Sequence, residues 1–266
     1  MLRQAARSVL SQTFADLELI IVPNAATAQA IDAARDIAAR HADVSVVVLS
    51  RGHLAGARNA GLRAARGEWI AFLDDDDLWL PTKIEEQVRE ARASGADLII
   101  CDVIAFDARG PIGPMETPTP PGLTIAEALT IYDCLPGSAS GALVRVAALR
   151  SLGGFDEAMP ACEDWDMWRR LCWRHKVSRV PTALAMYRVH HSMSRKRALM
   201  FRGDLHHLVK MTFDTPRHLR HALWRGWRER LWRLTANGYA ALDRATGGLA
   251  GSTYRTMRRI ARALGT

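Results

Sequence analysis

The sequence predicts an α/β fold, in which a mixed, mainly parallel sheet carries helices on both faces, followed by a basic helical C-terminal tail. Short and continuously apolar strands alternate with helical segments over the first hundred residues, which is typical of strands buried on both faces. A hydrophobic content of 48% over 266 residues is enough for one large domain with its own core. Charge is also unevenly distributed, which sets the C-terminal region apart.

The elements follow from the apolar pattern and its breakers. Strands are expected at 17–22, 44–49, 68–73, 97–104 and 140–146. Helices are expected at 2–13, 26–41, 55–66, 81–94, 123–134 and 163–175, with Pro81 at a favoured first-turn position. Residues 110–122 are rich in Pro and Gly, so we expect a loop there, either over the site or as a surface excursion. Ligands of such sheets bind beyond the carboxyl ends of the strands.

The charge divides the chain near residue 195. Residues 195–266 contain 16 Lys and Arg against 4 Asp and Glu, whereas residues 1–194 contain 20 against 24. We therefore expect a catalytic domain over 1–195 and a basic helical region over 196–266 that meets something anionic. The four cysteines show no C-x-x-C spacing, so a zinc site or disulfide framework is not expected. No apolar run of 18 residues occurs, so no membrane span is predicted.

Four aspartates, residues 74–77, directly follow the apolar run 68–73. Because like charges repel at this spacing, a positive group is expected nearby. Asp74 and Asp76, two positions apart, can aim two carboxylates at one hard divalent cation, which would stabilise a diphosphate leaving group. Of Asp75 and Asp77, one is expected to contact a ribose hydroxyl or the substrate, and the other to cap the next helix. The alternative is an acidic surface turn.

Three further clusters carry candidate site residues. Arg58 lies near a helix start in a glycine-containing segment, where phosphate oxygens are bound, although a plain surface helix has the same pattern. Glu163 and Asp164 open the helix 163–175, either as a general base or as favourable charges at a helix N-terminus. Arg188 and His190 lie in a short polar loop whose histidine could complete a metal shell, contact phosphate or simply be exposed.

Five segments in this order resemble the family 2 glycosyltransferases, which are inverting, nucleotide-sugar-dependent enzymes of the GT-A fold. They are SVLSQTFADLELIIV, GARNAGLRAARGEWIAFLDDDDLW, GGFDE, EDWDMW and YRVHHSMSR, and they span roughly residues 3–195. The resemblance implies a DxD motif at Asp74 and Asp76 that binds Mg²⁺ or Mn²⁺ together with the donor's diphosphate and ribose. It implies a catalytic base at Asp164, beside Glu163.

The same resemblance implies that Arg58 holds the donor nucleotide and that His190 closes over donor and metal. The chain departs from the family pattern in two places. Family members begin with a strand that is inside the sheet, and this chain opens at the following helix, so we expect the N-terminal strand to be missing. Where the family has an acidic residue that contacts the nucleotide base, this chain has Asn24, whose amide offers different hydrogen-bonding groups.

The basic region contains an amphipathic helix at 218–234. Its apolar face is formed by Leu219, Leu223, Trp227, Leu231 and Leu234, and arginines occupy much of the remainder. This pattern predicts a helix that lies on a membrane surface, with docking on the catalytic domain or on a partner subunit as the alternative. Nucleic acid is not expected as a partner, because the body is acidic and no nucleic-acid motif is present.

The sequence thus predicts a metal-dependent transferase, cytoplasmic and peripheral at the inner face of the cell membrane. It would move a sugar from a nucleotide-sugar donor, UDP- or dTDP-linked, to a surface glycan or lipid-linked acceptor. A phosphatase of the haloacid dehalogenase type is disfavoured, because Leu78 and Trp79 follow the aspartates where that class has Thr or Val. A degenerate, non-catalytic scaffold is the remaining alternative.

Overall fold

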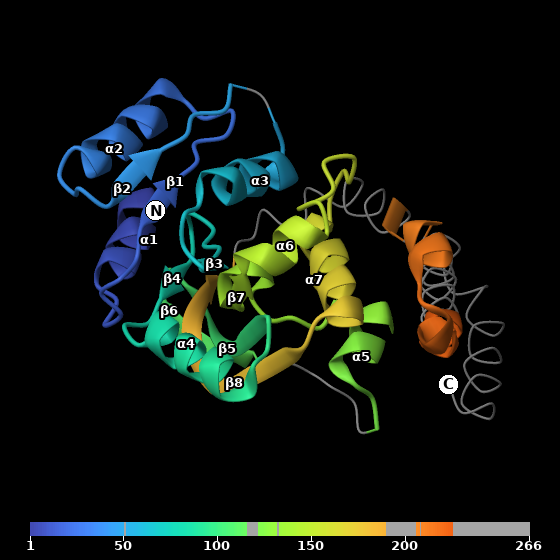
Figure 1. Ribbon diagram of the computed structural model, residues 1–266. Helices are drawn as coiled ribbons and strands as arrows, with labels where there is room; N and C mark the ends of the chain where they lie inside the picture. Colours follow the sequence, from blue (N-terminus) through green and yellow to red (C-terminus); the bar gives the residue numbers. More distant parts are fainter. Residues whose placement is uncertain (51, 116–121, 132, 190–205, 208, 226–266) are drawn as a thin grey trace, which may run out of the picture.

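The computed structural model describes residues 1–50, 52–115, 122–131, 133–189, 206–207 and 209–225 (Figure 1). Its strands are β1 (Leu19–Ile21), β2 (Val44–Val46), β3 (Trp69–Ala71), β4 (Leu78–Trp79), β5 (Leu98–Asp107), β6 (Gly110–Met115), β7 (Ala142–Arg145) and β8 (Val177–Arg188). Its helices are α1 (Leu2–Leu10), α2 (Ala28–Ala38), α3 (Leu54–Ala64), α4 (Lys83–Ser94), α5 (Ile125–Ile131), α6 (Val146–Ser151) and α7 (Glu163–Arg174), with 3-10 turns η1 (Ser138–Gly141) and η3 (Arg217–Leu219). All the expected helices and strands are present, most of them shorter by one to four residues at an end.

The strands form two sheets. β1 and β2 pair in parallel, and the larger sheet has the order β3-β7-β5-β8-β4, with β6 added to β5. The larger sheet is mixed, because β5 runs parallel to β8 and antiparallel to both β6 and β7. This arrangement confirms the predicted α/β class with a mixed sheet. It also contains more antiparallel pairing than the apolar strands indicate, because antiparallel central strands can be equally buried on both faces.

The loop expected at 110–122 is wrong in its first half, where β6 pairs antiparallel with β5. The prolines at 111 and 114 argued against a strand, but β6 pairs with one strand only, and edge strands tolerate the missing N–H. A register shift between Ala105 and Phe106 bends this hairpin. Residues 116–121 lie outside the described residues.

Helix α4 covers one face of the larger sheet, and α7 with α5 and α6 covers the other (Figure 1). Phe155 meets Phe72 and Trp168 edge to face under the second face, with ring centroids 5.2 and 5.9 Å apart, and the Phe72 and Trp168 rings are tilted by 52° at 6.4 Å. Trp168 and Leu171 of α7 are fully buried there. This packing fixes α7 relative to the carboxyl end of β3, where the aspartates begin.

The division into two sheets falls between β1 and β3. Of the strands that the structure describes, β1 pairs only with β2, and β3 pairs only with β7. The Glu18 carboxylate accepts hydrogen bonds from the Arg66 backbone N–H and side chain at 2.8 and 3.0 Å, which ties the starts of the two strands together.

Residues 206–207 and 209–225 pack on the body of the protein. Leu219 and Leu223 of the predicted membrane stripe are buried, with 5% and 4% of their surface exposed. His221 Nε2 lies 2.8 Å from the Glu127 carboxylate of α5. For these two leucines the docking alternative is therefore correct, and their assignment to a membrane contact is wrong, because an amphipathic helix can bury its apolar face against protein instead. Trp227, Leu231 and Leu234 lie outside the described residues.

Candidate active site

The aspartate turn joins β3 to β4, which lie at opposite ends of the strand order of the larger sheet. The Asp74 N–H donates to Ser140 Oγ at 3.3 Å, and the Asp77 N–H donates to the Asp74 carbonyl at 3.1 Å, which closes the turn. Asp75 is exposed, and Asp74 and Asp76 are half-buried. The turn therefore presents the carboxylates of Asp74, Asp75 and Asp76 at the surface of the site.

Asp77 differs from the three aspartates before it, because only 1% of its surface is exposed. Its carboxylate accepts from Ser140 Oγ at 2.6 Å and from the Arg188 backbone N–H at 2.8 Å. Burial raises the pKa of Asp77 to about 7, against these two hydrogen bonds, which lower it. In this arrangement Asp77 links the turn to η1 and to the end of β8, so its contact with a donor stays a prediction without geometric support.

Arg58 is the positive group that the aspartates require. It lies in α3 with 7% of its side chain exposed, and its Nη1 is 2.5 Å from Glu163 Oε1. Its Nη2 lies 3.4 Å from Asp74 Oδ1, so one guanidinium bridges two acidic clusters that are far apart in sequence. Burial works to lower the pKa of Arg58, but the charges of Asp164, Asp74 and Glu163 outweigh it and raise that pKa.

The second acidic cluster opens α7. Cys162 precedes the helix with a positive φ of 62°, a conformation that turns the chain sharply into its first turn. Glu163 is buried against Arg58, and burial and the charge of Asp164 raise the pKa of Glu163 although Arg58 opposes them. Asp164 is half-buried, and its Oδ1 accepts from the Trp165 N–H at 2.8 Å. Asp164 is thus the more accessible of the two carboxylates.

The charges of both acidic clusters shift the pKa values of the same side chains. Burial raises the pKa of Asp74, and Asp164 and Asp76 add to the rise while Arg58 opposes it. Burial also raises the pKa of Tyr187, near the end of β8, with further contributions from Asp77, Asp74 and Asp76 and a smaller one from Asp164. The structure therefore brings Asp74, Asp76, Glu163 and Asp164 into one site.

Asn59, next to Arg58, couples α3 to the turn that precedes α7. Its Nδ2 donates to the Phe155 carbonyl at 2.8 Å and to Glu157 Oε1 at 2.9 Å, and its Oδ1 accepts from the Phe155 N–H at 2.8 Å. Gly154 approaches so closely that a Cβ there would lie 2.6 Å from Asn59 Oδ1. These contacts hold Arg58 and the start of α7 in a fixed relation.

Asn24 lies after β1 in a parallel bridge with Leu49. Its Oδ1 is buried and has no hydrogen-bond partner among the described residues. Gly52 packs against it, because a Cβ at that position would lie 2.9 Å from this oxygen. An acceptor that is buried without a partner is costly, so this position is suited to a donor group of a ligand.

Arg188 binds the aspartate turn directly. Its Nε donates to the Asp76 carbonyl at 2.7 Å, and its guanidinium lies 4.2 Å from the centroid of the Phe106 ring. Sequence reasoning did not select Ser140, which positions Asp74 and Asp77, or assign a role to Tyr187. Ser140 lies in a segment of small residues, PGSASG at 136–141, that carries no catalytic signal, whereas Tyr187 could have been found as the residue before Arg188 at the strand end.

A metal centre is only partly assembled in the described residues. No group of three His, Cys, Asp or Glu side chains in that part of the chain is placed to hold a metal ion. Two carboxylates, Asp74 and Asp76, are near enough for the charge of one to raise the pKa of the other. Such a pair fits a hard cation that takes its remaining ligands from diphosphate oxygens and water. His190, expected as a third ligand, lies outside the described residues.

The model of glycosyl transferase family 2 matches residues 1–153, and that of glycosyltransferase-like family 2 matches residues 118–222. Since the first match covers more than half of the chain, the protein belongs to glycosyl transferase family 2. This membership confirms the resemblance and overturns the phosphatase alternative.

Two relatives with named roles are similar to part of this chain. The chain is 39% identical over 84 residues to the UDP-Glc:α-D-GlcNAc-diphosphoundecaprenol β-1,3-glucosyltransferase WfaP of Escherichia coli. This match covers 30% of this chain and 32% of WfaP. It is 35% identical over 111 residues to the succinoglycan biosynthesis protein ExoO of Rhizobium meliloti, covering 40% of this chain and 31% of the relative. The matches thus span about a third of the length of each relative.

Solved structures show the same fold. The mannosyltransferase PcManGT of Pyrobaculum calidifontis, in complex with GDP-Man and Mn²⁺, aligns with a TM-score of 0.67 at 19% identity over 98% of this chain and 76% of that one. TarS residues 1–349 of S. aureus, in complex with UDP-GlcNAc, aligns with a TM-score of 0.66 at 18% identity over 84% of this chain and 66% of that one. Both likenesses confirm the GT-A-type fold.

Proposed function

We propose that the protein is an inverting glycosyltransferase that moves a sugar from a nucleotide-sugar donor to a hydroxyl of a glycan or lipid-linked acceptor. The observation that carries the proposal is the buried Arg58, which joins the aspartate turn to the start of α7. An inverting transfer needs a leaving-group seat and a base on opposite sides of one sugar. Two acidic clusters bridged by one guanidinium provide such a pair of sites.

The donor side is assigned to the aspartate turn and Asn24. Asp74 and Asp76 would hold Mg²⁺ or Mn²⁺, which when bound neutralises the diphosphate as it leaves. Asp75, exposed next to them, is suited to a ribose hydroxyl. The unpartnered Asn24 Oδ1 can accept a hydrogen bond from a base N–H, which uracil and thymine both offer. UDP- and dTDP-sugars are therefore the proposed donors.

Asp164 is assigned as the base and Glu163 as its support. Glu163 is held by Arg58 at 2.5 Å, whereas Asp164 is more accessible. The acceptor oxygen bonds to the anomeric carbon as the bond from that carbon to the diphosphate oxygen breaks. The electron pair leaves with the nucleoside diphosphate, and the acceptor proton passes to the Asp164 carboxylate.

An acceptor at a membrane surface is supported by the tail. No described helix is both long enough and apolar enough to cross a membrane. Phe213 and Trp224 are 81% and 69% exposed, and the exposed Arg217 and Arg220 lie between them in the sequence. Exposed aromatic and basic side chains favour an anionic membrane interface. We therefore place the enzyme peripherally at the inner face of the cell membrane.

Calorimetric titration of UDP, dTDP, GDP and CDP, with and without Mn²⁺, tests the donor site. We expect UDP or dTDP to bind only with Mn²⁺, and Asp74→Ala and Asp76→Ala to abolish that binding. Exposed Asp32→Ala in α2 is the matched control and should bind as the wild-type protein does. A folded wild-type protein that binds none of the four would contradict the proposal and favour the non-catalytic scaffold.

A further inference from the structure

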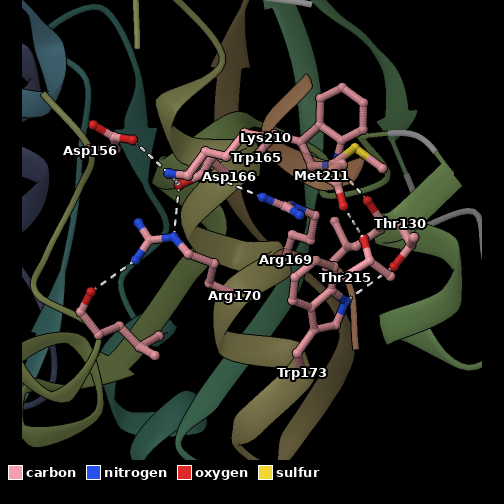
Figure 2. A network of polar contacts seen from close by, with 12 residues as sticks. Thr130, Asp156, Trp165, Asp166, Arg169, Arg170, Trp173, Lys210, Met211 and Thr215 are labelled. Atoms are coloured by element: carbon pink, nitrogen blue, oxygen red, sulfur yellow. Dashed lines mark hydrogen bonds and ion pairs between the residues drawn. The ribbon is translucent and has the colours of Figure 1, made fainter. Parts of the chain in front are cut away.

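The C-terminal segment reaches the helix that carries the predicted base. Lys210 Nζ lies 2.6 Å from Asp156 Oδ2 and 3.0 Å from Asp166 Oδ2, so one ammonium joins the turn before α7 to the first turn of α7 (Figure 2). Asp166 is fully buried and lies two residues after Asp164. This contact is therefore close to the catalytic machinery without being part of it.

Three positively charged side chains form ion pairs with the Asp166 carboxylate. Arg169 Nη2 and Arg170 Nε lie 2.8 and 2.7 Å from its two carboxylate oxygens, and Lys210 shares the second oxygen. Burial works to raise the pKa of Asp166, but the charges of Arg170, Arg169 and Lys210 outweigh it and lower the pKa to about 2. Arg170 also donates to the carbonyls of Leu152 and Gly154 at 3.0 and 2.9 Å. The buried carboxylate thus connects α7, the preceding turn and the C-terminal segment.

A second contact is made one residue from the base. The His207 ring stacks on the Trp165 ring with centroids 3.9 Å apart and planes 19° apart, and Trp165 Nε1 donates to the Leu129 carbonyl of α5 at 2.7 Å. His207 and Met211 are buried, as is Leu219 further along. The segment therefore packs on the residues that flank Asp164.

We propose that Lys210 is a positioning residue: with residues 206, 207 and 209–223 it holds the first turn of α7, and hence Asp164, at a fixed place relative to the donor site. This inference rests on the proposed function, because it assigns the base to Asp164. Catalysis depends on geometry to within about 1 Å, and a displacement of that size can cost on the order of 100-fold in rate. The donor seat itself is formed by the β3–β4 turn, which Lys210 does not contact in the described structure.

The test uses the full chain with Lys210→Met, which keeps the length and apolar stem but loses the charge, and Lys210→Arg, which keeps the charge. Lys176→Met is the matched control, since Lys176 is a surface lysine that donates to the Ser94 carbonyl at 2.7 Å. Three quantities are measured: backbone hydrogen exchange over residues 165–168, the affinity for UDP with Mn²⁺, and the kinetics of sugar transfer. Transfer is followed as UDP release from UDP-glucose with GlcNAc-diphosphoundecaprenol in micelles.

For Lys210→Met we expect exchange over 165–168 to rise at least tenfold and kcat to fall about 10- to 100-fold, with the UDP affinity unchanged within twofold. Lys210→Arg should restore exchange and kcat to within about threefold of the wild-type values, and Lys176→Met should match the wild-type protein. Unchanged exchange, or unchanged kcat, in Lys210→Met would overturn the inference.

The measurements distinguish a failure of the positioning role of Lys210 from a failure of the proposed transferase function. Exchange is measured without substrate, so it decides whether Lys210 holds α7 even if the wild-type protein transfers no glucose. A folded wild-type protein that binds none of the four nucleotides, UDP, dTDP, GDP and CDP, would contradict the proposed function. Rapid exchange in Lys210→Met together with a normal kcat would leave that function intact and overturn only the positioning role.

Discussion

The Arg58 guanidinium lies 2.5 Å from the Glu163 carboxylate, and both side chains are 7% exposed. These residues are 105 positions apart, and their contact joins α3 to α7. Because Arg58 also reaches Asp74, the pair determines how the two acidic clusters face each other.

Arg58→Met should destabilise the protein strongly. It leaves Glu163 buried without its cation, and breaking a buried pair in this way costs about 3–5 kcal/mol. Urea unfolding measures this change in the free energy of unfolding. Arg3→Met is the control, because the Arg3–Asp36 pair is exposed and should contribute no more than about 1 kcal/mol. Similar losses in the two variants would contradict the assigned role of the buried pair.

Asp77 should make stability depend on pH. Its pKa is about 7 in the folded protein and near 3.8 in the unfolded chain, so between these values the folded state binds the extra proton. Stability therefore falls as the pH rises from about 4 to about 7, by on the order of 2–4 kcal/mol.

Asp77→Asn removes this titration. Urea midpoints between pH 5 and 8, measured in EDTA, should fall for the wild-type protein and vary less for the variant. Equal slopes would show that other groups, such as Glu163 or Asp74, carry the pH dependence.

Gly153 and Gly154 form a matched pair, since both have φ of 78°. Gly153→Ala meets no atom within 4 Å and should cost only the backbone term, about 1 kcal/mol. Gly154→Ala adds a collision with Asn59 Oδ1, and we expect a loss at least 1 kcal/mol larger. Thermal unfolding of both variants checks this order, and a Gly153 variant that is the less stable of the two would refute it.

The exposed aromatic side chains of the tail should contribute to membrane binding. The double variant Phe213→Ser, Trp224→Ser is expected to bind vesicles of anionic phosphatidylglycerol at least fivefold more weakly in a flotation assay. Ile112→Ser in β6, which removes a comparably exposed side chain from the body, is the control. If the wild-type protein, the double variant and Ile112→Ser bound the vesicles equally, the membrane contact would lie elsewhere or would not exist.

Local pattern predicted most of the helices and strands in their order, the aspartate turn at the end of β3 and the acidic start of α7. It did so because apolar periodicity and strand ends are properties of neighbouring residues. It missed β4, α6 and β8, and it placed Arg188 in a loop although this residue ends β8. The β6 strand was missed because prolines disfavour strands in general, and only the topology shows that this one is an edge.

The contacts between residues far apart in the chain could also not be predicted from the sequence. Arg58 could be placed near a phosphate, but its buried partner Glu163 is known only from the fold. The leucines of the tail had the periodicity of a membrane helix, and periodicity does not say whether the buried face meets lipid or protein. Their burial beside α5 and α7 was decided by tertiary packing.

The central claim is that the aspartate turn holds the donor while Asp164 removes the acceptor proton. The most direct test is Asp164→Asn, assayed for Mn²⁺-dependent UDP binding and for UDP release from UDP-glucose with GlcNAc-diphosphoundecaprenol. We expect the variant to have unchanged UDP affinity and a kcat lower by about 10²–10⁴-fold. An Asp164→Asn protein that transfers sugar at the wild-type rate would contradict it.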